Sequence, residues 1–197
     1  TADFLVIEGP LAGGHLGFSR EQLEDIPSLD YDTEIQNIIA LKQTYEEKYQ
    51  TTIPVFVAGG MFTAEDATHV MELGADGIQA ATRFVATEEC DASDAYKQAY
   101  VNASDDDVII IKSPVGMPGR AIKNAFIERM LTAPDKISHC FNCLKACNPV
   151  TAPYCITQAL INAVVGDLDN GLIFCGSRVG EIKEITTVPK LMQELTI

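Results

Sequence analysis

A glycine-rich segment with one histidine follows the first apolar run of the chain. Residues 4–7 (Phe-Leu-Val-Ile) predict a buried parallel strand, and residues 8–17 (Glu-Gly-Pro-Leu-Ala-Gly-Gly-His-Leu-Gly) predict a loop at its carboxyl end. Glycines let the backbone of such a loop approach a ligand closely. His15 has a side chain that titrates near neutral pH, so it is the first candidate for a catalytic acid or base. A solvent-exposed loop histidine without a catalytic role is the alternative.

Two later strands are predicted to end in loops that could bind an anion. The first segment, residues 54–60, ends in Gly59 and Gly60. The second strand, predicted at residues 76–80, is followed directly by Ala81 and Thr82. Backbone N–H groups without an obstructing Cβ, together with a hydroxyl group, can bind phosphate oxygens. A simple reversal of the chain at the two glycines is the alternative.

The spacing of apolar residues predicts strands and helices that alternate along the chain. Thr33 is a candidate N-cap, and Thr63 with Asp66 forms a candidate capping box. Four strand-then-helix units in series predict an α/β fold with one parallel sheet and right-handed crossovers. The predicted strands are residues 4–7, 53–57, 76–80 and 108–111, and the predicted helices are residues 33–49, 63–74, 88–102, 121–131, 156–165 and 188–195.

Four of the six cysteines lie close together, as Cys140-x₂-Cys143-x₃-Cys147-x₇-Cys155. Clustering of this kind favours a metal site or reduced thiols over a disulfide framework. Four thiolates suit a zinc ion or a [4Fe–4S] cluster, and the packing of reduced cysteines is the alternative. Because this segment departs from the strand–helix pattern, we expect a cysteine-rich, mainly helical appendage at 132–197 that packs on the α/β part at 1–131.

The charge of the chain limits its partners. The formal net charge is −14, and the sequence has no lysine or arginine cluster. Binding to nucleic acid or to an anionic membrane surface is therefore not expected, because both need clustered positive charge. No stretch has the roughly 20 apolar residues of a membrane-spanning helix, and no secretory leader is recognisable. We expect a cytoplasmic protein that acts on a small-molecule substrate.

Four motifs in order resemble the nitronate monooxygenase family, formerly called 2-nitropropane dioxygenase: residues 8–17, 54–60, 74–84 and 113–124. That family also contains the FMN-dependent enoyl-acyl-carrier-protein reductases. The resemblance implies an FMN-binding TIM barrel, (β/α)₈, with a histidine that corresponds to His15. A complete barrel of this kind takes about 250 residues, so the 197 residues here are expected to form only its C-terminal half.

The resemblance also implies roles for individual residues. His15 would be the catalytic residue. At the position of Ala81, relatives usually have glycine. The residues expected to contact FMN are Glu8, Gly13, Gly14, Gly59, Gly60, Ala81 and Thr82. For Glu8, an ion pair with a lysine or arginine is the alternative. The cysteine pattern is similar to the cluster-binding cysteines that follow the barrel in 2,4-dienoyl-CoA reductase, although the last gap is longer in those enzymes.

Three functions are compatible with this resemblance. The first is oxidation of nitronates or nitroalkanes with O₂, in which FMN is the redox cofactor and His15 handles the proton. The second is an NAD(P)H-dependent enoyl-thioester reductase. The third is a non-catalytic metal-binding fragment, or half of a barrel that another polypeptide completes. We expect unpaired strand edges at residues 4 and 108, through which copies of the chain associate or the N-terminal half of the barrel docks. Alone, the chain is expected to be inactive and to bind FMN weakly.

Overall fold

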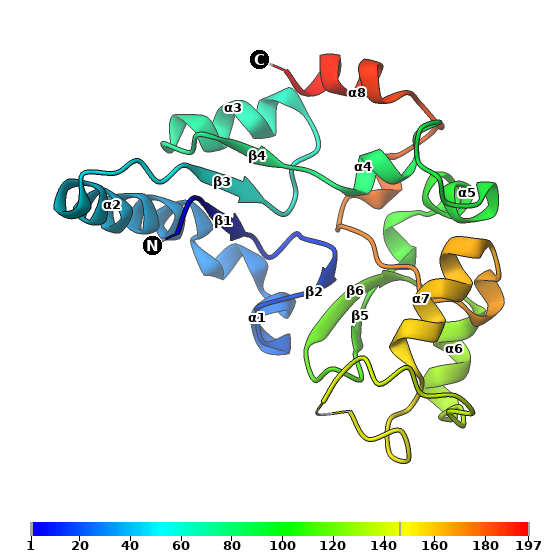
Figure 1. Cartoon of the computed structure of the whole chain (residues 1–197). Coiled ribbons are helices and arrows are strands. Elements are labelled where there is room, and N and C mark those ends of the chain that lie inside the picture. Colours follow the sequence, from blue (N-terminus) through cyan, green and yellow to red (C-terminus); the bar gives the residue numbers. More distant parts are fainter. Residues whose placement is uncertain (1, 146, 197) are drawn as a thin grey trace.

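A parallel sheet forms the N-terminal part of the molecule (Figure 1). The computed structural model describes residues 2–145 and 147–196. Strand order is β1-β3-β4, from β1 (Leu5–Glu8), β3 (Val55–Ala58) and β4 (Gly77–Gln79). All pairings are parallel, as predicted from the alternating pattern.

The helices and 3₁₀ turns complete the description of the chain. No described helix is both long and apolar enough to cross a bilayer. The helices are α1 (Arg20–Glu24), α2 (Tyr31–Tyr49), α3 (Ala64–Glu72), α4 (Thr82–Val85), α5 (Asp94–Asn102), α6 (Ala125–Thr132), α7 (Ile156–Val165) and α8 (Val188–Leu195), and the 3₁₀ turns are η1 (Ile26–Leu29), η2 (Asp105–Asp107), η3 (Leu168–Asn170) and η4 (Val179–Glu181).

Helices α2 and α3 cover one face of the parallel sheet. Ile35 of α2 and Val70 of α3 are buried against Val55 and Val57 of β3. Burial of these branched side chains removes apolar surface from water and fixes the ends of the strands in space. The sheet thereby holds the loops after β1, β3 and β4 at one edge, which is where ligands bind in parallel α/β folds.

The sequence predicted the start of α3 correctly, but not the start of α2. Thr63 and Asp66 form the predicted capping box, in which each side chain accepts a hydrogen bond from the other's backbone N–H. The predicted N-cap at Thr33 is wrong, because α2 begins two residues earlier, after Asp30. Asp30 has φ 44° and links α2 directly to the preceding turn η1, so Thr33 lies inside the helix.

The prediction of a fourth parallel strand is also wrong. Strand β5 (Val108–Lys112) belongs to a separate antiparallel sheet of order β2-β6-β5, with β2 (Gly14–His15) and β6 (Pro118–Ile122). Residues 113–117 form a short turn, with Gly116 at φ 90°, and such a turn can join only antiparallel strands. The described strands thus form two open three-stranded sheets and no closed barrel.

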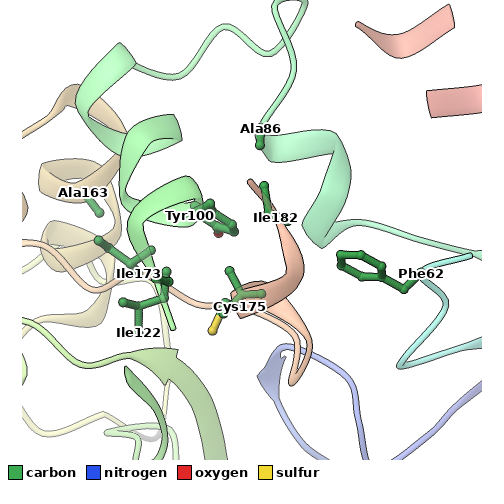
Figure 2. Packing of buried hydrophobic residues seen from close by; sticks show 10 residues of the cluster. Phe62, Ala86, Tyr100, Ile122, Ala163, Ile173, Cys175 and Ile182 are labelled. Carbon is green, nitrogen blue, oxygen red and sulfur yellow. The ribbon is translucent and has the colours of Figure 1, made fainter. Parts of the chain in front are cut away.

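The C-terminal segment joins the second sheet. Ile122 N–H donates to the Ile173 carbonyl at 2.9 Å, and Cys175 N–H donates to the Arg120 carbonyl at 3.1 Å. Figure 2 shows Cys175 close to Tyr100, Ile122 and Ile173 in the largest buried cluster. Residues on both sides of position 131 therefore share one core, while the proposed division of the chain there stays a prediction.

Candidate functional site

A pocket of about 280 Å³ lies at the carboxyl ends of β1, β3 and β4. Its walls come from the loops after these strands and from the segment that follows Phe174. All seven residues that were expected to contact a cofactor line this one pocket: Glu8, Gly13, Gly14, Gly59, Gly60, Ala81 and Thr82. The parallel sheet explains their convergence, because the carboxyl ends of its strands meet at one edge.

Two of the glycines allow close contacts between loops. A Cβ on Gly13 would lie 2.5 Å from the Cys175 carbonyl carbon, so only glycine fits between the two backbones. Gly59 has φ 87°, and a Cβ there would lie 2.7 Å from the Gly9 carbonyl oxygen. Gly13 was expected to bring the backbone close to a ligand, and its tightest contact is instead with the segment at 175–176.

The segment at 175–178 is a part of the pocket that the motifs did not predict. Gly176 N–H donates to Thr82 Oγ1 at 2.9 Å, which leaves the Thr82 hydroxyl hydrogen available to another acceptor. Ser177 Oγ is buried and has no hydrogen-bond partner among the described residues. Buried polar atoms are normally paired, so the unpartnered Ser177 hydroxyl indicates a site for a polar ligand group. The Gly-Ser-Arg run at 176–178 was the only sequence signal.

Arg178 lines the pocket, and its guanidinium group is paired with two carboxylates. Its Nη1 lies 2.6 Å from Asp66 Oδ2, and Nη2 lies 2.9 Å from Glu181 Oε2. The same guanidinium group lies 4.7 Å from the centre of the Phe62 ring, and Arg83 stacks on this ring at 5.0 Å. These contacts connect the C-terminal segment to α3 and hold the Arg178 side chain in place.

His15 lies beside this pocket rather than in its lining. Its Nε2 atom is 2.7 Å from Ser113 Oγ, and its ring packs edge-on against Phe174, with ring centres 5.0 Å apart. Phe174 lines the pocket. Partial burial lowers the pKa of His15 below its ordinary value, which favours the neutral imidazole near pH 7. A neutral imidazole that is held on two sides suits a general base.

Glu8 stands at the end of β1 and lines the pocket. Burial raises the pKa of its carboxyl group. Among the described residues Glu8 has no ion pair, so the alternative of a partner lysine or arginine gains no support. The ring of Tyr31 packs over the adjacent Gly9, and its hydroxyl donates to the Ile7 carbonyl at 3.3 Å.

The predicted metal site is not supported. Across residues 2–145 and 147–196, no group of three or more His, Cys, Asp or Glu side chains is placed to hold a metal ion. Cys140 and Cys143 are exposed, whereas Cys147 and Cys155 are half-buried. Cys143 Sγ accepts a hydrogen bond from the Thr157 hydroxyl at 3.1 Å, as a reduced thiol does. Spacing alone could not show whether these four thiols converge, and in the fold they do not.

Comparisons with known proteins agree with the resemblance seen in the sequence. A probable nitronate monooxygenase from Staphylococcus saprophyticus is 32% identical over 135 residues, which are 68% of this chain and 36% of that protein. The structure of FabK from Thermotoga maritima superposes with a TM-score of 0.70 and 27% identity over 98% of this chain and 53% of FabK. A nitroalkane oxidase from Streptomyces ansochromogenes shares the fold, with a TM-score of 0.63 and 24% identity over 98% of this chain and 50% of that chain.

The chain thus spans 36% of the similar curated protein and about half of each similar solved chain. The family model described as nitronate monooxygenase matches residues 1–197, which is the whole chain. This match extends well beyond the glycine motifs and includes both sheets and the C-terminal segment. The chain therefore belongs to the nitronate monooxygenase family.

Proposed function

We propose that the protein is an FMN-dependent oxidoreductase that oxidises nitronates or nitroalkanes with O₂. The observation that carries this proposal is the position of His15, which contacts Ser113 on one side and Phe174, at the wall of the glycine-lined pocket, on the other. FMN, when bound, would supply the redox chemistry. His15 would accept the proton from the substrate carbon next to the nitro group.

The polar atoms of the pocket suit the phosphate of FMN. The hydroxyls of Thr82 and Ser177 can donate to phosphate oxygens, and Gly59 and Gly60 bring backbone close without a side chain. The charge of Arg178, which also lines the pocket, is already paired with Asp66 and Glu181, so we propose hydroxyl and backbone N–H groups as the phosphate donors. Ala81, where relatives usually have glycine, also lines the pocket.

A second candidate is an NAD(P)H-dependent enoyl-thioester reductase, which the similarity to FabK over 98% of the chain favours. In this reaction His15 would deliver a proton to the substrate. Oxygen uptake with a nitronate, compared with anaerobic flavin reduction by NAD(P)H, discriminates between the two reactions. The non-catalytic metal-binding alternative is not retained, because the four cysteines do not form a site.

Further strands are proposed to complete the sheet. Phe4 and Val6, on the face of the sheet away from α2 and α3, are 57% and 41% exposed, although both are large and apolar. Among the described residues the edges of the parallel sheet are β1 and β4, whereas β5, the other edge expected from the sequence, lies at an edge of the antiparallel sheet. Such edges pair with other strands, either from a second copy or from a complementary half-barrel.

Titration of the protein with FMN and with riboflavin, followed by flavin fluorescence, tests the proposed cofactor. We expect FMN to bind and riboflavin, which lacks the phosphate, to bind at least tenfold more weakly. Equal binding of the two flavins would exclude the phosphate site. No binding of either flavin, even at concentrations high enough to detect the weak binding expected of the chain alone, would exclude a flavin site in this chain.

A further inference from the structure

Arg120 is the most deeply buried charged side chain in the described part of the chain. It belongs to β6, and only 4% of its surface is exposed. Lys97, the other buried cation, has Asp94 at 3.9 Å, whereas Arg120 forms no ion pair with any carboxylate group of the described residues. Burial of a charge without a counter-ion is strongly unfavourable, so this cation needs a partner.

The guanidinium group of Arg120 also uses few of its hydrogen-bond donors. Its Nη1 donates to the Ala12 carbonyl, which is its one hydrogen bond to the described residues. A guanidinium group has five N–H donors, and buried donors are normally paired. Burial lowers the pKa of Arg120, although the group stays protonated near neutral pH. The fold therefore maintains a positive charge that its own polar groups compensate only in part.

Arg120 lies directly behind the wall of the glycine-lined pocket. It is the partner of Gly14 in the pairing of β6 with β2, and its backbone carbonyl accepts from Cys175 N–H at 3.1 Å. Ala12, Gly14 and Cys175 all line the pocket. The charge of Arg120 is thus one residue away from the pocket, and the protein interior between them screens it less than water does.

The other ionisable groups around this pocket do not neutralise Arg120. Burial raises the pKa of Cys175 to about 12, so its thiol is uncharged near pH 7. Glu8 lines the pocket and forms no ion pair with Arg120, and Arg178 is already paired with two carboxylates. Among the described residues, Arg120 is therefore the cation whose charge remains available to an anion in this pocket.

We propose that Arg120 is the counter-charge for a phosphate group that binds in the glycine-lined pocket. It acts through its electric field rather than by contact, because Ala12 lies between its guanidinium group and the pocket. The buried Ser177 hydroxyl and the backbone N–H groups would make the contacts. Identification of the phosphate as that of FMN rests on the proposed function, whereas the anion site does not.

NMR of the arginine Nε–H groups in the ¹⁵N-labelled full chain tests the anion site directly. The chain has five arginines, and Arg120→Lys, which keeps the charge, assigns the Arg120 signal. Arg20, which is exposed on α1, is the internal control. We expect inorganic phosphate to shift the Arg120 signal with saturation and to leave the Arg20 signal unchanged, compared with sodium chloride at the same ionic strength. FMN should shift the Arg120 signal at lower concentrations than phosphate.

Variants separate the charge of Arg120 from its packing. Arg120→Met should weaken FMN binding about tenfold or more and riboflavin binding by less than about threefold, because only FMN carries the phosphate charge. A packing defect alone would weaken both flavins alike. Arg120→Lys should restore most of the preference for FMN. Arg20→Met, which removes the same charge from an exposed site, should bind both flavins as the parent does.

Two results would overturn the proposal. One is an Arg120 signal that responds neither to phosphate nor to FMN, and this measurement decides even if Arg120→Met does not fold. The other is an Arg120→Met variant that retains the parent's ratio of FMN to riboflavin affinity. If phosphate shifts the Arg120 signal but FMN does not bind the protein, the proposed oxidoreductase function fails and the anion site stands.

Discussion

His15 Nε2 lies 2.7 Å from Ser113 Oγ, although 98 positions separate the two residues in the chain. The contact joins strand β2 to the turn between β5 and β6. It depends on the antiparallel pairing of β2 with β6, in which His15 lies opposite Gly119. The sheet that the strand pattern did not predict is therefore the one that positions the candidate catalytic residue.

In the full-length protein, with the barrel complete, replacement of His15 by glutamine should lower turnover by a factor of about 10² to 10⁴, the usual worth of a positioned acid or base. FMN affinity should stay within a few-fold of the parent, because His15 does not line the glycine-rich pocket. Steady-state kinetics and a flavin titration measure the two effects. His69→Gln is the matched control, since His69 is exposed, its ring contacts Asp32, and it lies on α3. Turnover of His15→Gln within threefold of the parent would remove His15 from the mechanism.

The pKa of His15 should make stability depend on pH. Burial lowers the pKa of this residue in the folded protein, whereas the unfolded chain has a value near 6.5. Between these two values the unfolded state binds more protons, so the free energy of unfolding should fall as the pH drops through about 6.5. NMR titration of the His15 ring should give a midpoint below 6.5, and a midpoint above 6.5 would contradict its desolvation. Urea unfolding of His15→Gln should show a weaker loss of stability between pH 7 and pH 5.5 than the parent.

Gly13→Ala should destabilise the protein by about 1–3 kcal/mol, as overpacking does. The added methyl group would lie 2.5 Å from the Cys175 carbonyl carbon, so one of the two loops must move. FMN binding should weaken as well, because both loops line the pocket. Gly17→Ala is the matched control, since a Cβ at Gly17 has no neighbour within 4 Å. Equal unfolding midpoints of the two variants in urea would show that the loops do not pack as described.

Asp66→Ala should lower the free energy of unfolding by about 1–3 kcal/mol, because it removes a helix cap and a charge-assisted hydrogen bond together. Asp66 accepts from Thr63 N–H at 2.7 Å and from Arg178 Nη1 at 2.6 Å. Glu65→Ala, at an exposed position in the same turn, should change stability by less than about 0.5 kcal/mol. Thermal or urea unfolding of both variants measures the difference. If Asp66→Ala and Glu65→Ala lowered the free energy of unfolding by similar amounts, the contacts of Asp66 would contribute little to stability.

These hydrogen bonds also lower the pKa of Asp66, although its partial burial acts in the opposite direction. The stability they provide should therefore be present above the ordinary pKa of about 3.9 and be lost as the pH falls below it. The difference in the free energy of unfolding between Asp66→Ala and the parent should therefore shrink in acid. A difference that stays constant down to pH 3 would show that protonation of Asp66 is not linked to stability.

The family, the three strands of the parallel sheet and seven of the residues that line the pocket could be predicted from the sequence. Short-range features carry these signals: β-branched runs predict β1 and β3, the Thr63–Asp66 spacing predicts the start of α3, and glycines mark the loops after the strands. Helices α7 and α8 begin and end at the predicted residues, because an apolar stripe and clear boundaries define them.

Only the tertiary structure decided which distant groups meet. Strand β6 contains proline and glycine, so it forms through its pairing with β5 and β2 rather than through its own propensity. The contact of His15 with Ser113, the entry of Ser177 and Arg178 into the pocket, and the separation of the four cysteines all depend on long-range packing. Spacing in the sequence determines what a segment can form locally, whereas packing determines which side chains share a site.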